Sequence, residues 1–324
     1  MLRAAEHVHR ETQQKKLCLA GGVALNCVGN GRLLRESSFE DIWIQPAAGD
    51  AGGAIGAALF AWHQVEGNIR RANGRDSQSA SLLGPEFDND AIRRFLEEKA
   101  IPFVDLSDSE LIDKTAELMT EENVIGWFQG RMEFGPRALG GRSIIGDARS
   151  PHMQSRMNLK IKYRESFRPF APTVLQERVA DYFDIDRASP YMLLVATVKK
   201  EKRRRMSEDE ERLWGIDKLN VVRSKVPAIT HVDYSARLQT VSKEENGRYY
   251  QLIKRFAEKT GCPVIINTSF NVRGEPIVCT PQDAYTCFMH TEMDYLVLGN
   301  FILDKKEQAR FADNSDWKKQ YELD

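Results

Sequence analysis

The sequence lacks several features that would place it in a distinct class of protein. Its five cysteines are scattered and form no CxxC pair, and most lie in apolar runs, so we expect reduced, buried thiols and a cytoplasmic location. The longest nearly uncharged apolar run, residues 51–62, is far shorter than the ~20 apolar residues that a membrane helix needs. The first residues contain no apolar stretch typical of a secretory signal. No membrane partner is therefore expected.

An excess of charge of one sign is also lacking. The chain carries 46 Lys and Arg against 47 Asp and Glu, a formal net charge of -1, which gives no reason to expect wholesale binding of nucleic acid. No internal repeat is visible. With 42% apolar and 29% charged residues, the composition is that of a soluble globular protein. The length of 324 residues fits two domains, or one domain and part of another.

The order of apolar and polar segments indicates an α/β fold. The first part suggests a strand at 17–20, a glycine turn and helix, a strand at 42–44 and a small-residue helix from residue 50, whose glycines predict close backbone approach. The polar stretch 67–81 is the best linker candidate. We therefore divide the chain into 1–66, a linker at 67–84, and 85–324. Helices are expected near 89–99, 108–121, 247–260 and 281–289, and strands near 123–129, 191–198, 263–267 and 294–303.

A charged stretch at residues 199–212 is expected to be a solvated, mobile excursion. It contains Arg203, Arg204 and Arg205, which suit contact with nucleic acid, but the acidic block beside them weakens that interpretation.

Basic residues gather among glycines and prolines between residues 131 and 168. Nine Lys and Arg stand there against three acids, Glu133, Asp147 and Glu165. Glycine lets backbone N–H groups approach a ligand, and the planar guanidinium matches phosphate or carboxylate, so this region suits a polyanionic small molecule. A solvated basic face is the alternative, and Glu133 and Glu165 are expected to orient arginines. The expected anion contacts are Arg131, Arg137, Arg142, Lys160, Lys162, Arg164 and Arg168.

A polar cluster at residues 266–277 follows an apolar strand. It offers Asn267, Thr268, Ser269 and Asn271 at the carboxyl end of that strand, where open α/β sheets bind ligands. Such amides and hydroxyls can hold phosphate, ribose or a carbamoyl group. The alternative is a turn in which these side chains only satisfy the backbone.

A third cluster lies near the start of the chain. Gly21, Gly22 and Asn26 precede one helix, and Asp50 begins another within a glycine-rich run. The amino end of a helix favours anions. Asp50 is therefore either an N-cap or a metal ligand.

Long runs of this sequence resemble the O-carbamoyltransferases of the nodulation-protein and antibiotic-biosynthesis type. The runs GRMEFGPRALGGRSIIGDARSP, MNLKIKYRESFRPFAPTV and INTSFNVRGEPIV resemble the C-terminal half of that family. The runs LCLAGGVALNCVGNGRLL and IWIQPAAGDAGGAIGAAL resemble the end of its N-terminal domain. The resemblance covers roughly residues 1–310. It implies a twisted, mixed YrdC-like sheet with helices, preceded by part of an actin-like (Kae1-like) lobe.

The resemblance also implies an activity. YrdC-like domains carry a KxR…SxN signature, which Lys162, Arg164, Ser269 and Asn271 match. Such a domain makes carbamoyl-adenylate from carbamoyl phosphate and ATP with Mg²⁺, and the Kae1-like domain transfers the carbamoyl group to a hydroxyl of a small-molecule acceptor. The residues expected to be catalytic are Lys162, Arg164 and Arg137. The resemblance further implies an Fe²⁺ ligand at Asp50. His231 is a candidate carbamoyl contact.

The chain departs from the family pattern in length. Family members are near twice as long, and the HxxxH spacing of their iron ligands is not matched by His7 and His9. A fragment with the first lobe missing is expected, in which the exposed apolar surface favours a homodimer. The alternatives are an RNA-binding module of the YrdC type and a truncated carbamoyltransferase without activity.

Overall fold

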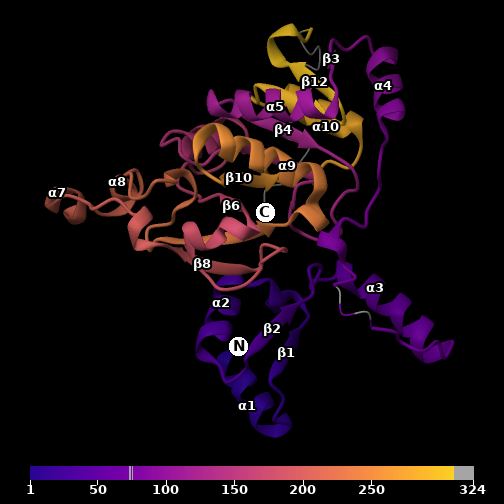
Figure 1. Cartoon of the computed structure of the whole chain (residues 1–324), viewed down its shortest axis with the longest axis vertical. Helices are drawn as coiled ribbons and strands as arrows, with labels where there is room; N and C mark the ends of the chain where they lie inside the picture. Colours follow the sequence, from indigo (N-terminus) through magenta and orange to yellow (C-terminus); the bar gives the residue numbers. More distant parts are fainter. Residues whose placement is uncertain (73, 75, 310–324) are drawn as a thin grey trace.

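The computed structural model describes residues 1–72, 74 and 76–309. A small N-terminal unit lies against one side of a larger body, and that body is built on a ten-stranded sheet (Figure 1). The end of the predicted second domain, residues 310–324, lies outside the described residues. The α/β class expected from the sequence is confirmed.

The N-terminal unit contains two parallel strands flanked by helices. Its elements are α1 (Leu2–Thr12), β1 (Lys16–Leu19), α2 (Cys27–Glu36) and β2 (Asp41–Ile44). Both strands lie within a residue of their expected positions, whereas α1 was not predicted. Helix α2 begins where it does because the Asn26 side chain accepts a hydrogen bond of 3.0 Å from the Gly29 N–H. Ala5, Leu33 and Phe39 form the small core that joins α1 to α2.

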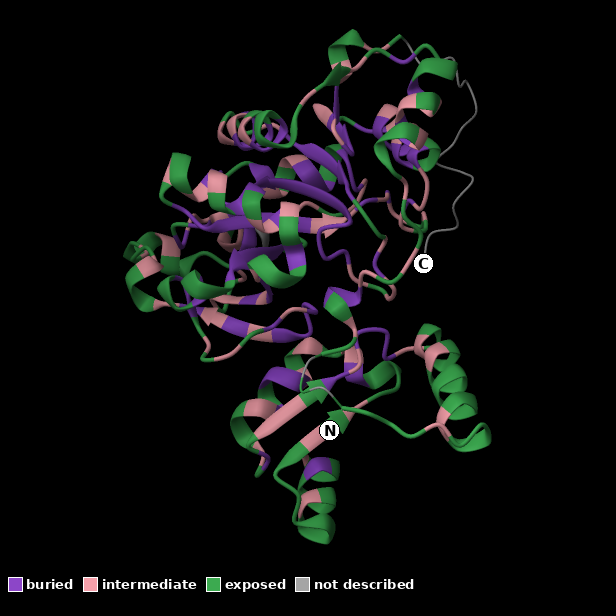
Figure 2. Ribbon diagram, turned by 45° about the vertical axis from the view of Figure 1, so that its right-hand side comes forward, coloured by how far each residue is buried: buried purple, intermediate pink, exposed green. Residues whose placement is uncertain are grey.

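Helix α3 (Ala51–Phe60) continues into a π-turn, Ala61–Val65, and projects from the rest of the molecule (Figure 1). None of these residues is buried (Figure 2). The expected close approach holds at Gly52, where an added Cβ would lie 2.1 Å from the carbonyl oxygen of Ala47. It does not hold at Gly53 or Gly56, around which no atom lies within 4 Å of such a Cβ.

The large sheet is mixed and has the strand order β3-β12-β11-β4-β5-β10-β6-β9-β8-β7. The pairs β11–β4 and β6–β9 are parallel, and the other pairs are antiparallel. The central strand β10 pairs with β5 on one side and β6 on the other. The strand bounds are β3 (Val104–Asp105), β4 (Ile125–Phe128), β5 (Arg142–Asp147), β6 (Ala171–Leu175), β7 (Phe183–Asp184), β8 (Leu194–Val198), β9 (Ser235–Val241), β10 (Val264–Ser269), β11 (Tyr295–Leu298) and β12 (Phe301–Asp304).

Helices cover this sheet, and the four expected helices are present. The expected helices are α4 (Asn89–Glu98), α5 (Asp108–Thr120), α9 (Lys243–Thr260) and α10 (Pro281–His290), and α6 (Met153–Lys160) was not predicted. Capping boxes begin two of them, from Ser107 to Glu110 in α5 and from Thr280 to Asp283 in α10. Helix α9 begins at Lys243, earlier than the predicted start at 247. It includes one additional turn, which is separated from the rest of the helix by a kink at Gly247, where φ is 41°.

One expected strand was wrong. The apolar stretch 294–303 forms the two strands β11 and β12, because Gly299 takes a φ of 55° and turns the chain back on itself. Strands β3, β5, β6, β7 and β9 were not predicted.

The charged excursion after β8 is built from short helices. They are a 3₁₀ turn at Lys200–Lys202, α7 (Glu208–Arg212) and α8 (Gly215–Leu219). Arg203 donates to the carbonyl oxygen of Val198 at 2.8 Å and stacks on Tyr234, and Arg204 pairs with Glu210. Two of the three clustered arginines are thus engaged within the chain. Among the described residues, no helix is both long and apolar enough to cross a bilayer.

Candidate functional site

A pocket of about 390 Å³ lies between the N-terminal unit and the large sheet. Cys27 and Val28, at the start of α2, form one wall, and Val195 of β8 lies beside them. The other walls come from β9, from the end of β10 and from the loop between α6 and β6. The lining side chains that carry chemistry are Cys27, Arg164, Arg168, His231, Asp233, Ser235, Arg237 and Thr268.

Arginines dominate the electrostatics of this pocket. The Arg237 side chain forms no hydrogen bond or ion pair with the residues that the structure describes, whereas its backbone lies opposite Val195 in the β8–β9 pair. Burial, and to a lesser extent the nearby charges of Arg137 and Arg164, lower its pKa to about 10. Arg164 also has a pKa of about 10, through burial and the charge of Arg168. Several positive charges are therefore held together at an energetic cost, which an anion in the pocket would relieve.

Arg137 lies beside the pocket rather than in its lining. Burial lowers its pKa, and its Nε atom is buried without a hydrogen-bond partner among the described residues. Its only hydrogen bond in the described part of the chain is a long one, 3.4 Å from an Nη atom to the carbonyl oxygen of Leu25. Its guanidinium group is therefore still available to an anion.

The two halves of the KxR…SxN signature meet in space. The Lys162 ammonium donates to the Ser269 and Asn271 carbonyl oxygens at 2.5 and 2.8 Å and to the Asn271 Oδ1 at 2.7 Å. The Ser269 hydroxyl also donates to this Oδ1, at 2.6 Å. Lys162 is only 4% exposed and does not line the pocket. It is a positioning residue, because it fixes the segment that follows Thr268.

Lys162 has no carboxylate partner among these contacts. Burial lowers its pKa to about 7, and the charge of Arg164 acts in the same direction. The charged ammonium group is thus energetically unfavourable inside the protein, although the hydrogen bonds that Lys162 donates require this charged form.

Lys162→Met is expected to remove a pH dependence of stability. In the unfolded chain this lysine has its ordinary pKa of 10.5, so from about pH 7 upward the unfolded state binds more protons than the folded state. The free energy of unfolding of the unaltered protein therefore contains a component that rises with pH across this window. The urea midpoints of both proteins, measured between about pH 7 and 9, should show a smaller slope in the variant. Equal slopes for the two proteins would contradict a lowered pKa of Lys162 in the folded state.

The glycine-rich loop before β5 folds around an internal anion. The Glu133 carboxylate accepts hydrogen bonds from the N–H groups of Leu139, Gly141 and Arg142, at 2.6, 2.7 and 3.1 Å. Gly140, between them, has a φ of 109°, and a Cβ there would lie 2.3 Å from the Tyr249 ring. These N–H groups therefore serve the protein and not a ligand. Glu133 itself binds backbone, whereas the sequence had suggested that it orients arginines.

Arg142 was expected at the anion site, but the structure places it in the core. Its guanidinium is fully buried and lies 3.6 Å from the centre of the Phe128 ring. Burial lowers its pKa to about 10. Backbone carbonyl oxygens use its donors, which ties the loop to its neighbours. Those carbonyls belong to Pro85, Gln129, Gly130, Gly141 and Cys279.

Three other expected contacts also lie outside the pocket. Arg131 is exposed 3.6 Å from Glu86, and Lys160 forms an exposed 2.8 Å ion pair with Glu292. Asn267 is fully buried, because its amide nitrogen donates to oxygens on three neighbouring segments. Those acceptors are Ala138 O, Thr173 Oγ1 and Gln239 Oε1.

The N-terminal cluster does not line the pocket. Gly21, with a φ of 92°, and Gly22 open a short 3₁₀ turn, and Asn26 caps α2 immediately before Cys27. Asp50 is exposed and makes no capping hydrogen bond. Within the described residues, no group of three or more His, Cys, Asp or Glu side chains could hold a metal ion. These residues alone thus do not fit an iron site, and the metal-binding role of Asp50 stays a prediction.

Four of the side chains that line the pocket were missed from the sequence, namely Cys27, Asp233, Ser235 and Arg237. Arg237 is a charged residue between the buried Ala236 and Leu238, and a charge inside an apolar strand was the available signal. Cys27 carried no such signal, because only the packing of α2 on β8 brings it to the pocket. His231, the candidate carbamoyl contact, does line it, 3.4 Å from Asp233.

Comparison with known proteins assigns the chain to a family. Residues 116–305 match the model of the carbamoyltransferase C-terminus. The chain belongs to the carbamoyltransferase family. Residues 1–59 match the carbamoyltransferase N-terminus of the same family.

Relatives of this carbamoyltransferase chain are longer than it is. It is 60% identical to an uncharacterized protein of Synechocystis, over the whole chain and 53% of that protein. It is 40% identical to the nodulation protein NolO of Bradyrhizobium diazoefficiens, over 96% of the chain and 52% of that protein. The chain thus spans about half the length of the curated relatives it matches. The crystal structure of HypF in the phosphate- and nucleotide-bound form aligns with a TM-score of 0.39 at 18% identity, over 59% of this chain and 25% of that one.

Proposed function

We propose that this carbamoyltransferase chain binds carbamoyl phosphate in the arginine pocket and catalyses the ATP-dependent activation of its carbamoyl group. The supporting observation is the set formed by Arg137, Arg164 and Arg237, whose pKa values are all lowered by burial. Buried positive charge is stabilised by an anion of complementary shape, and a guanidinium fork fits two phosphate oxygens at once. The chemistry that such a pocket can perform is therefore centred on phosphate.

The proposed reaction has three steps. Water hydrolyses carbamoyl phosphate to carbamate and inorganic phosphate. A carbamate oxygen then attacks the α-phosphorus of ATP, the bond to the β-phosphate oxygen breaks, and pyrophosphate leaves. The product is carbamoyl-adenylate, whose carbonyl carbon accepts the hydroxyl oxygen of a small-molecule acceptor while AMP leaves. Positioned cations stabilise the charge on the phosphoryl oxygens during such transfers.

The residues of this chain have distinct parts in that scheme. Arg164, Arg168 and Arg237 bind the anions, and the hydroxyl of Thr268 faces the same space. Lys162 holds the segment of Ser269 and Asn271 in place. No step is assigned to Mg²⁺ or Fe²⁺, because the described residues assemble no acidic or histidine cluster for either ion. Transfer to the acceptor is proposed for the longer proteins of the family.

The test is release of pyrophosphate from ATP and Mg²⁺. We expect release that requires carbamoyl phosphate and that falls at least about 100-fold in Lys162→Ala, because the site loses its geometry. Lys160→Ala is the matched control, two residues away. It should retain activity because the Lys160 ammonium is exposed and forms an ion pair with Glu292.

Two outcomes would contradict the proposal. Folded protein that releases no pyrophosphate and binds no carbamoyl phosphate would exclude this activation step for the chain. Salt-sensitive binding of RNA, unaffected by ATP or carbamoyl phosphate, would instead favour an RNA-binding module.

A further inference from the structure

A second, larger cavity lies at the edge of the sheet away from the arginine pocket. It has a volume of about 670 Å³, and Val104, Leu106 and Ile302 form an apolar floor. Strand β3 is the last strand on this side, so within the described residues its outer edge pairs with no other strand. Val104 is 58% exposed although it is β-branched and apolar. An unpaired edge beside exposed apolar surface is a place where another chain can add.

The rim of this cavity is acidic. Glu110, Asp304 and Glu307 line it, and the sole basic residue of its described lining is Lys114, which is paired with Glu117 at 3.2 Å. The negative field acts on Tyr295, whose pKa is raised by burial and by the charge of Asp304. An apolar floor with an acidic rim fits a segment that has an apolar side chain next to basic ones.

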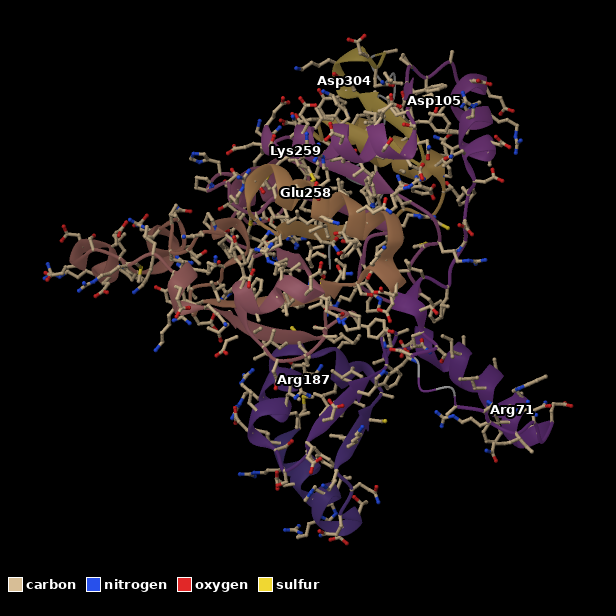
Figure 3. The ribbon with its side chains drawn as sticks, in the orientation of Figure 1. Arg71, Asp105, Arg187, Glu258, Lys259 and Asp304 are labelled. Atoms are coloured by element: carbon tan, nitrogen blue, oxygen red, sulfur yellow. The ribbon has the colours of Figure 1, made fainter. Side chains whose placement is uncertain are left out.

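The same chain exposes such a segment elsewhere. Residues 67–72 follow the π-turn after α3 and form no helix or strand. Ile69 is 83% exposed, and the exposed Arg70 and Arg71 follow it directly. Figure 3 labels Arg71 at the projecting end of α3, at the lower right, and Asp304 at the top of the molecule, so the segment does not reach the groove of its own chain.

We propose that the groove at β3 binds residues 68–71 of a second copy of this chain. Ile69 would cover Val104 and Ile302, and Arg70 and Arg71 would face Asp304 and Glu307. The C-terminal residues 310–324 are a poorer match, because they contain three basic and four acidic side chains. Two copies side by side in opposite directions would make both contacts at once, which gives a closed two-fold dimer. This surface is independent of the proposed function.

Charge exchange between the two surfaces tests the proposal. The mass of the chain in solution is measured by light scattering over a concentration series that reaches about 100 µM, at low and high salt. We expect a dimer whose dissociation constant rises about tenfold or more in Arg70→Glu/Arg71→Glu and in Asp304→Lys/Glu307→Lys. A chain with all four substitutions should regain the dimer. Arg3→Glu/Arg10→Glu, exposed on α1, is the control and should leave dimerisation unchanged.

Several results would overturn it. A wild-type chain that stays monomeric throughout, or a dimer that neither charge reversal weakens, would show that this groove does not bind a second copy. A monomer that instead binds a synthetic lysine-rich peptide in the groove would show that the occupant is a different cationic chain. Circular dichroism confirms that each variant is folded, which is expected since the altered side chains are exposed, except for the half-buried Asp304.

Discussion

Arg237→Met is expected to weaken the binding of carbamoyl phosphate about 100-fold without lowering the stability of the protein. The loss corresponds to two charge-assisted hydrogen bonds of about 1.5 kcal/mol each, in a pocket where the guanidinium is otherwise without a partner. The folded state should be unaffected or slightly more stable, because an unpaired buried charge next to Arg137 and Arg164 is removed. Titration calorimetry with carbamoyl phosphate and urea unfolding give the two quantities.

The combination of effects distinguishes a binding residue from a structural one. A structural arginine such as Arg142, with its donors on backbone carbonyls, would destabilise the protein when replaced. Arg178→Met is the control, because Arg178 forms an ion pair with Asp181 near the surface and away from the pocket. Unchanged affinity in Arg237→Met, or a large fall in stability, would show that Arg237 does not hold the anion.

Glu133→Gln is expected to lower the free energy of unfolding by about 3 kcal/mol, since a carboxylate that accepts several N–H groups is replaced by a neutral amide. The glutamine retains one acceptor oxygen and turns its NH₂ group toward donors. Glu133 is 5% exposed, so water does not replace the lost hydrogen bonds. Its charge also opposes the lowering of the Arg142 pKa by burial, and that compensation is lost with it.

Urea unfolding followed by tryptophan fluorescence measures this change. Glu165→Gln is the comparison, because Glu165 is a half-exposed acid in an ion pair with Arg168 and should cost less than about 1 kcal/mol. A similar small cost for both substitutions would mean that the loop does not depend on its internal carboxylate.

The sequence predicted elements with strong local signals. Helices α5 and α10 have capping boxes, and α4 has an Asp88 cap that accepts from the Ala91 N–H at 2.8 Å, so their starts were readable. Strand β5 was missed because it begins with an arginine that becomes buried only through tertiary contacts with carbonyl groups. The hairpin of β11 and β12 was missed because one glycine carries the turn.

The sequence predicted the chemical type of the candidate site but not the full set of residues that line it. The sequence indicated an anion pocket with Arg164, Arg168 and Thr268, and these side chains do lie together. Counting basic residues could not separate arginines that bind backbone from arginines that face a cavity. Arg142 was therefore included among the expected anion contacts, and Arg237 was missed. That distinction depends on which acceptors the folded chain brings within reach.

The position of β10 at the centre of the sheet bears on how the chain folds during synthesis. Strands β5 and β6 both pair with β10, which is made much later than either of them. At ~5–20 residues per second, residue 269 leaves the ribosome roughly 5 to 20 seconds after residue 175. Throughout that interval both strands expose unpaired edges and apolar faces. A nascent chain that stops before β10 is therefore expected to aggregate, and binding of a chaperone in this interval would increase the yield of folded protein.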